Sequence, residues 1–155
     1  MKGNLIIARA KVHDEEVVAL VQRHVERARA ETGQGSAHAL DAAELDRRGV
    51  RLWGAWEAEQ LLGVGGLARL DSQHGELKCF FTIEEARGRG VAGQILQCIM
   101  STARREGLVR LSLETGAWSY FVAARAFYAR YGFELCEPFG SYRKDPNSVF
   151  MTRAL

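Results

Sequence analysis

Apolar residues recur along the chain with two different periods, and each period predicts one type of element. In the segments 14–30 and 90–106 they return every three to four positions, which predicts two amphipathic helices. Between these segments lie three strand-like runs, 50–57, 61–70 and 76–83, joined by short polar connections. Strands this closely spaced usually pair with their neighbours, so we expect an antiparallel meander.

The remaining segments continue the alternation of strands and helices. A strand is expected at 5–10, and the spacing Asp41-x-x-Glu44 is typical of a capping box that begins a short helix. Further elements are a strand at 108–113, a helix at 121–130, and two final strands at 133–136 and 148–153. We therefore predict the α/β class, of the α+β type, as a single domain over residues 1–155.

Composition and charge narrow the class of protein. A chain of 155 residues can bury its own core, and a net charge of only +2 argues against a surface that coats nucleic acid. Cys79, Cys98 and Cys136 are an odd number and widely separated, which favours reduced thiols over disulfides. The four histidines are scattered singly, so no metal site is predicted. Without a signal peptide or a long apolar span, we expect a cytoplasmic protein that does not bind membranes.

A glycine-rich loop directly precedes the second long helix, in the order Arg87-Gly88-Arg89-Gly90-Val91-Ala92. Glycine lets the backbone approach a ligand closely, and the first amides of a helix have no intrahelical acceptor. The two arginines add charge of the sign that a phosphate needs. The loop therefore predicts a phosphate-binding site at the start of that helix.

A later segment completes a recognisable pattern. Residues 124–133 read Ala-x-x-Phe-Tyr-x-x-x-Gly-Phe, roughly forty residues after the glycine loop. In this order the two motifs resemble the GNAT superfamily of N-acetyltransferases, and the resemblance covers nearly the whole chain. The stretches 36–41, 73–78, 113–116 and 138–151 also resemble a bacterial subgroup of acetyltransferases, which names no substrate.

The resemblance implies a fold and an activity. The fold is a mixed, mostly antiparallel central sheet flanked by helices. The activity is direct transfer of an acetyl group from acetyl-CoA to a primary amine of a small molecule, an amino acid or a protein. Family members are often homodimers, and neither a metal nor nucleic acid is implied.

The resemblance also implies where acetyl-CoA binds. The pyrophosphate would lie on the glycine loop, through Arg87, Gly88, Arg89, Gly90, Val91 and Ala92. The pantetheine arm would run along residues 79–83 like an added strand, contacting Phe81, Thr82 and Ile83. A backbone amide near Phe81 or Thr82 would then polarise the thioester carbonyl.

The glycine loop has a second interpretation. Residues 88–93 also satisfy the dinucleotide fingerprint G-x-G-x-x-G, with Glu114 about twenty residues further on. A doubly wound sheet needs several crossovers, whereas the strands before this loop look antiparallel and too few elements follow it. The loop arginines also suit the several phosphates of coenzyme A better than a single pyrophosphate. We therefore favour the coenzyme A interpretation over a nicotinamide cofactor.

Deprotonation of the amine is the most demanding catalytic step. An alkylammonium of pKa ~10.4 is neutral about once in 2,500 molecules at pH 7, a deficit of roughly 4.6 kcal/mol, whereas a thiol of pKa ~8.5 departs readily. Glu76 is our candidate for the base, since many GNAT enzymes carry a glutamate at the corresponding position. Glu114, at the end of the next strand, is the reserve candidate.

The alternation of the strand at 76–83 supports this choice. It puts Leu77, Cys79, Phe81 and Ile83 on one face, which we expect to be the core, and puts Glu76 and Lys78 on the other face. A surface pair between Glu76 and Lys78 is the purely structural alternative.

Tyr128 is the candidate general acid, because it matches the tyrosine of the family motif and its phenol could protonate the departing thiolate. Packing is the alternative role, in an aromatic stripe with Phe127 and Tyr131. The chain departs from the pattern at Phe121, where many members carry an asparagine that contacts the coenzyme. That polar contact is lost or supplied elsewhere.

The acceptor pocket is predicted from loop and strand residues, namely His38, Trp53, Glu114, Phe139 and Tyr142. His24 lies on the apolar stripe of the first helix and is expected to be a core residue. A catalytically silent module that binds acyl-CoA is the alternative to an enzyme. Glu76 and Tyr128 favour the enzyme, because binding alone requires neither.

Overall fold

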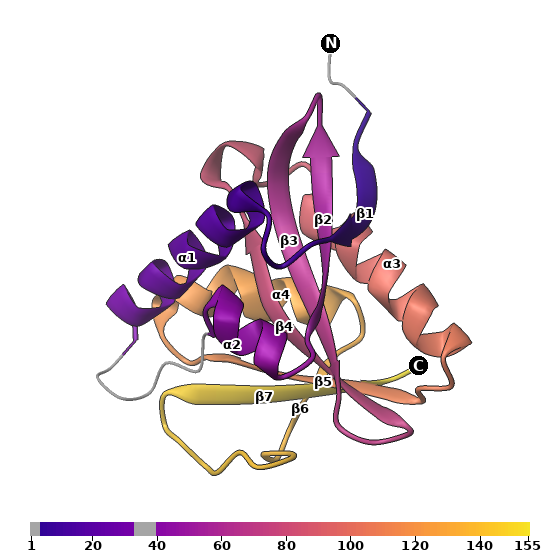
Figure 1. The fold of residues 1–155 in the computed structure, drawn as a ribbon. Coiled ribbons are helices and arrows are strands. Elements are labelled where there is room, and N and C mark those ends of the chain that lie inside the picture. The colour runs from indigo at the N-terminus through magenta and orange to yellow at the C-terminus, as the bar shows by residue number, and fades with distance from the viewer. Residues whose placement is uncertain (1–3, 33–39) are drawn as a thin grey trace.

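The computed structural model describes residues 4–32 and 40–155, and its seven strands form one sheet (Figure 1). The strands lie in the order β1-β2-β3-β4-β5-β7-β6. Their bounds are β1 Ile6–Ala10, β2 Arg51–Glu57, β3 Gln60–Arg69, β4 His74–Thr82, β5 Arg110–Gly116, β6 Glu134–Cys136 and β7 Ser148–Ala154. The helices are α1 Glu15–Ala30, α2 Ala42–Arg47, α3 Val91–Arg105 and α4 Val122–Arg130, with short 3-10 turns η1 at Glu84–Ala86 and η2 at Ser119–Phe121.

The pairing of the strands confirms the predicted meander and the mixed, mostly antiparallel sheet. Strands β1 to β4 pair with their sequence neighbours in antiparallel order, and β5, β7 and β6 do the same. Among the strands of the described residues, only β4 and β5 pair in parallel, and α3 provides the crossover between them. A single parallel crossover is too few for a doubly wound dinucleotide sheet, so the nicotinamide alternative has no fold to support it.

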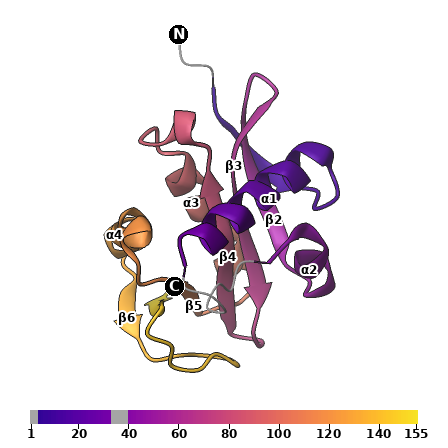
Figure 2. The same cartoon turned by 90° about the vertical axis from the view of Figure 1, so that its left-hand side faces the viewer.

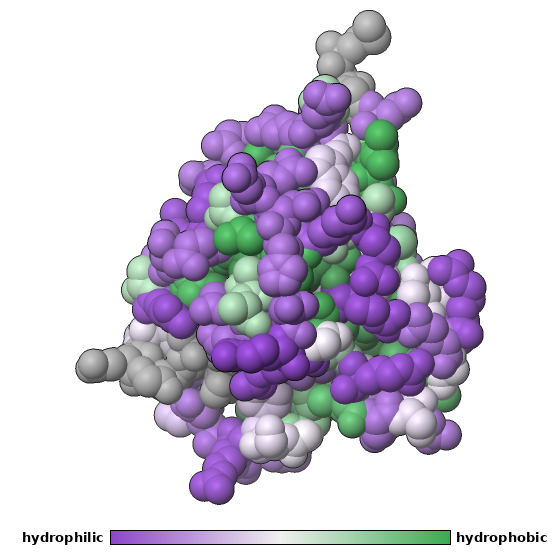
Figure 3. Space-filling model, in the orientation of Figure 1, coloured by the Kyte–Doolittle hydropathy of each residue, from purple (hydrophilic) through white to green (hydrophobic). Residues whose placement is uncertain are grey.

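The helices cover the sheet in two layers (Figures 1 and 2). Helices α1 and α2 cover one face, and α3 and α4 cover the other. Helix α1 buries an i, i+4 stripe of Val17, Val21 and Val25, while α3 buries Ile95 and Ile99. On the α1 and α2 side the outer surface is mostly hydrophilic, with apolar atoms visible between the helices (Figure 3). Within residues 4–32 and 40–155, no helix has the length and apolarity to cross a membrane.

The ends of the helices follow the predicted signals. The carboxylate of Asp41 accepts a hydrogen bond from the backbone N–H of Glu44 at 2.9 Å, as expected of an N-cap. Gly107 and Gly132, which follow α3 and α4, have φ angles of +84° and +88°. That left-handed conformation terminates a helix at little cost only when the residue is glycine.

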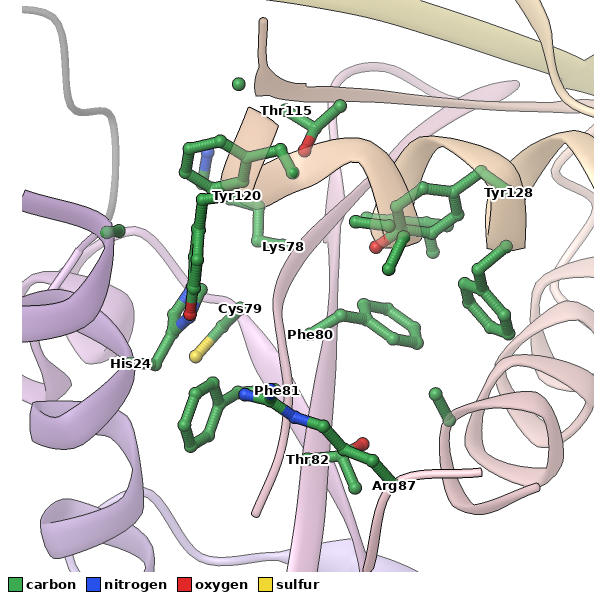
Figure 4. A pocket seen from close by; sticks show the side chains of 18 of the residues that line it. His24, Lys78, Cys79, Phe80, Phe81, Thr82, Arg87, Thr115, Tyr120 and Tyr128 are labelled. Carbon is green, nitrogen blue, oxygen red and sulfur yellow. The ribbon is translucent and has the colours of Figure 1, made fainter. Parts of the chain in front are cut away.

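A β-bulge interrupts β4, and the prediction that Leu77, Cys79, Phe81 and Ile83 share one face is therefore wrong. In the register with β3, Lys78 pairs with Gly66 and Phe81 pairs with Val64, so that two residues of β4 oppose the single residue between them. Cys79, inside the bulge, has a φ of +59°. The extra residue reverses the alternation: Phe80 contacts the α3 side of Gly65, and Phe81 faces His24 of α1 (Figure 4).

Strands β4 and β5 separate just before the bulge. Their parallel pairing runs from His74 with Arg110 to Leu77 with Leu113 and goes no further. Both strands continue beyond this point, β4 to Thr82 and β5 to Gly116. Backbone groups of β4 that would have bonded β5 therefore face a gap in the sheet.

Candidate active site

The gap between β4 and β5 opens into a cavity of about 500 Å³ that is lined from both faces of the sheet (Figure 4). Helix α1 and the segment around α2 supply His24, Ala28 and Leu45 on one side. The glycine loop, α3 and α4 line the other side. A cavity of this size at a split in a sheet suits a small-molecule site.

The glycine loop forms one end of this cavity. Arg87, Gly88 and Gly90 line it together with the first turn of α3. Gly88 and Gly90 have φ angles of +77° and +79°, and a Cβ added to either glycine would meet no atom within 4 Å. The left-handed turns aim backbone amides outward beside the positive end of the helix dipole. The chemistry and space of these residues are compatible with a pyrophosphate.

Two of the predicted coenzyme ligands lie away from the cavity. The guanidinium of Arg89 forms an ion pair with Glu57 at the end of β2 instead of lining the cavity. Ile83 is buried, and its backbone N–H donates to the carbonyl of Leu62 at 2.9 Å. Arg87 is therefore the loop arginine that lines the cavity.

The β4 backbone at the gap provides an edge for an extended ligand. Cys79, Phe81 and Thr82 line the cavity, whereas β3 occupies the opposite edge of β4. Alternate N–H and C=O groups on the free edge can pair with an amide-containing chain such as pantetheine. The side chain of Cys79 carries no charge here, because burial raises the pKa of its thiol to about 12.

Tyr128 projects from α4 toward Phe80 of β4 (Figure 4). Its side chain is buried and lines the cavity, with the rings of Phe80 and Phe127 packed edge-on against it at centroid distances of 6.0 and 5.1 Å. Burial raises the pKa of the phenol above its usual range, so Tyr128 stays protonated and can donate a proton. Tyr128 therefore packs within an aromatic group and also lines the cavity.

Glu114 lies across the gap on β5 and lines the cavity. Burial raises the pKa of its carboxyl to about 7, and the ammonium of Lys78 partly offsets that effect. A carboxyl whose pKa lies near neutrality suits general base catalysis at neutral pH.

Glu76 forms a buried cluster with Lys78 and Tyr142. The phenol of Tyr142 donates to Oε2 of Glu76 at 2.6 Å, and Nζ of Lys78 lies 3.1 Å from the same oxygen. Nζ of Lys78 also donates to the Tyr142 hydroxyl at 2.9 Å. Lys78 lines the cavity, whereas Glu76 and Tyr142 lie outside its wall. The pair of Glu76 and Lys78 is thus a buried ion pair and not a surface pair.

The other predicted acceptor residues lie elsewhere. Trp53 is buried on β2, between the guanidinium groups of Arg9 and Arg51 at 4.9 and 5.7 Å from its ring, and does not line the cavity. Phe139 packs on Tyr142 and on Phe150 of β7, behind the cluster and outside the cavity. His38 falls outside the described residues.

The lining also includes residues that were not predicted as parts of the site, among them His24, Tyr120 and Lys78. His24 and Tyr120 line the α1 side (Figure 4), and burial lowers the pKa of the His24 imidazole to about 4, so it is neutral at pH 7. Lys78 lines the cavity beside Glu114. No local motif marks these three residues, since α1, β4 and η2 come together only in the fold.

Comparison with known proteins identifies the family. The family model described as "Acetyltransferase (GNAT) family" matches residues 13–133 of this chain. The chain belongs to the GNAT family of acetyltransferases. It is 44% identical over 140 residues to the N-acetyltransferase YsnE of Bacillus subtilis, a match that covers 90% of this chain and 93% of YsnE.

Solved structures show the same GNAT fold. An acyl-CoA N-acyltransferase of Klebsiella pneumoniae superposes with a TM-score of 0.81 at 24% identity, over 97% of each chain. A GNAT acetyltransferase of Elizabethkingia anophelis, solved with acetyl-CoA bound, superposes with a TM-score of 0.71 at 17% identity, over 99% of this chain and 100% of that one. The predicted family and fold are confirmed, and the chain is a GNAT-family N-acetyltransferase.

Proposed function

We propose that this N-acetyltransferase acetylates a small primary amine directly, with Glu114 as the general base and Tyr128 as the general acid. The observation that carries the proposal is their common position. Both side chains line the cavity in the gap between β4 and β5, which the glycine loop closes at one end. Bound acetyl-CoA supplies the thioester whose carbonyl carbon the amine attacks.

Glu114 carries the demanding part of the reaction. It accepts the proton that the acceptor ammonium must lose, because only the neutral amine has a free electron pair. A carboxyl of pKa about 7 is a stronger base than an ordinary glutamate and is still substantially ionised at neutral pH. Burial, which produces this pKa, also removes water that would compete for the amine.

Tyr128 and the backbone of β4 serve the thioester end. The protonated phenol donates its proton to the sulfur when the carbon–sulfur bond breaks, and it later regains a proton from solvent. A β4 amide at Phe81 or Thr82 stabilises the negative charge on the carbonyl oxygen. Arg87, Gly88, Gly90, Val91 and Ala92 hold the pyrophosphate through charge and backbone amides.

The choice of Glu114 over Glu76 rests on access. The side chain of Glu76 is buried, and two hydrogen bonds at its Oε2 engage it with Tyr142 and Lys78. Glu76 also lies outside the wall of the cavity, whereas Glu114 lines it. We therefore propose that Glu76 fixes Lys78 in place and does not itself take the proton.

The pH dependence of kcat/KM tests this assignment. Release of free thiol from acetyl-CoA, followed across an amine library, first finds an acceptor. With that acceptor, kcat/KM of the wild type should rise with pH through an apparent pKa near 7. Glu114→Gln should lose this transition and at least about 10²-fold in rate, the usual scale of general base catalysis.

Glu76→Gln is the matched variant, because it makes the same change of charge two strand positions from Lys78. It should retain the transition near pH 7 even where the absolute rate falls. If Glu76→Gln loses the transition and Glu114→Gln keeps it, the base is Glu76. If the protein binds acetyl-CoA but none of the amines tested causes release of free thiol, the result would instead fit the silent acyl-CoA-binding module.

A further inference from the structure

The lining of the cavity on the α1 and α2 side restricts the acceptor, if the proposed function above is correct. The glycine loop, α3 and α4 line the coenzyme end, so the acceptor must enter from the opposite face of the sheet. In the proposed reaction the acetyl group and part of the pantetheine arm would occupy part of the same cavity of about 500 Å³. The space that remains suits a small molecule more than a folded protein surface.

The walls on this side are apolar. Ala28 of α1, Leu40, Leu45 of α2 and Phe81 of β4 line it. His24 stands beside Phe81, with ring centroids 5.4 Å apart, and presents an uncharged imidazole. Burying an apolar group here is favourable by about 25 cal/mol for each Å² removed from water. A highly charged acceptor would lose its hydration without compensation.

Few charged side chains line the cavity among the described residues, and their charges differ between the coenzyme end and the acceptor end of the cavity. Glu114 is the one carboxylate among the described residues that line the cavity. A polyamine or an aminoglycoside carries several ammonium groups, and most of them would lack a partner in this lining. The cations of the lining are Arg87 and Arg130 around the coenzyme end and Lys78 beside Glu114.

Lys78 is held where it can bind an anion. Its ammonium has three N–H donors, and Oε2 of Glu76 and the hydroxyl of Tyr142 accept two of them. The cluster fixes the ammonium at the cavity wall, so little side-chain entropy is lost when a ligand binds there. One cation and one carboxylate, side by side on an apolar wall, match a zwitterion.

We propose that the acceptor is a small α-amino acid with an apolar side chain. Lys78 binds its carboxylate, Glu114 receives the proton of its amino group, and the walls from α1 and α2 enclose its side chain.

The test compares acceptors that differ in a single group. The wild type is assayed at pH 9, where Glu114 is ionised, with L-leucine, with 3-methylbutylamine (leucine without its carboxylate), with spermidine and with a lysine-containing peptide. Values of kcat/KM are calculated per concentration of neutral amine, which removes the difference in amine pKa. We expect leucine to exceed 3-methylbutylamine by about 100-fold, equivalent to about 2.7 kcal/mol.

The variant Lys78→Met isolates the carboxylate contact. Both rates will fall, because the charge of Glu76 loses its partner, but the ratio of leucine to 3-methylbutylamine should collapse to about 1. Lys144→Met is the matched control, since Lys144 is exposed and pairs with Glu137 away from the cavity. It should leave the ratio unchanged. If Lys78→Met does not fold, the wild-type ratio alone decides.

Each outcome has a distinct meaning. A wild type that prefers 3-methylbutylamine, spermidine or the peptide overturns the amino-acid proposal and leaves the proposed acetyltransferase chemistry intact. A ratio that Lys78→Met does not change overturns the role of Lys78. Failure to acetylate any amine, despite binding acetyl-CoA, overturns the proposed function itself and the acceptor proposal with it.

Discussion

Glu114 should make the fold less stable as the pH rises from 4.5 to about 7, and Glu114→Gln should remove that dependence. Burial raises the pKa of this carboxyl from 4.5 to about 7 in the folded chain. Such a shift corresponds to about 3 kcal/mol at 1.36 kcal/mol per pKa unit. Against an ordinary domain stability of about 5–15 kcal/mol, an effect of this size is measurable.

The direction follows from the proton that each state binds. Below pH 4.5 the carboxyl is protonated in both states, and it does not affect the pH dependence. Between pH 4.5 and about 7 the unfolded chain loses the proton while the folded chain keeps it, so the free energy of unfolding falls. Above pH 7 both states are ionised, and the loss stays at its full value of about 3 kcal/mol.

Urea unfolding of the wild type and Glu114→Gln at several pH values from 4.5 to 8 measures this difference. The free energy of unfolding of the variant, relative to that of the wild type, should increase by about 3 kcal/mol from pH 4.5 to pH 8, because glutamine cannot ionise. Glu59→Gln, in the exposed turn between β2 and β3, provides the same chemical change without burial. A difference between the wild type and Glu114→Gln that stays constant with pH would refute the burial argument and the base assignment built on it.

Three other variants test separate parts of the site. Tyr128→Phe should lower kcat by about 10²-fold while leaving the Kd for coenzyme A, measured by calorimetry, within a few-fold, because only the proton donor is lost. Gly116→Ala should lower the free energy of unfolding by about 1–3 kcal/mol in urea, since its Cβ would lie 2.1 Å from the ring of Phe121. Gly88→Ala has open space for its Cβ but would hold a φ of +77°, so we expect a cost of about 1–2 kcal/mol, seen as weaker coenzyme A binding.

The order of elements could be predicted from the sequence because it depends on local signals. The spacing of apolar residues predicted the bounds of helices α1 and α3 to within a residue or two. The short connections between the strands indicated the antiparallel pairing of β2, β3 and β4. The glycine loop was predicted for a similar reason. A positive φ is cheap only for glycine, so Gly88 and Gly90 mark the turn in the sequence itself.

The faces of β4 could not be predicted in the same way. The bulge places Cys79, which is not a glycine, at a φ of +59°. No turn-forming residue at this position of β4 indicates the bulge in the sequence. The register with β3 produces the bulge, because Gly65 alone stands opposite two residues. One unpaired residue then moved Phe80 to the side of Tyr128 and Phe81 to the side of His24.

The position of Glu114, the proposed base, depends on the same long-range geometry. Leu77 and Leu113 are the last paired residues of β4 and β5, so Glu76 lies within the closed part of the sheet and Glu114 lies just past its end. The hydroxyl of Tyr142, which is 66 residues distant in the chain, donates a hydrogen bond to Oε2 of Glu76. The alternation of residues in the sequence predicts only that Glu76 lies on the face opposite the apolar residues. Which carboxylate lines the cavity is decided by where β4 and β5 separate, and that point is a property of the whole sheet.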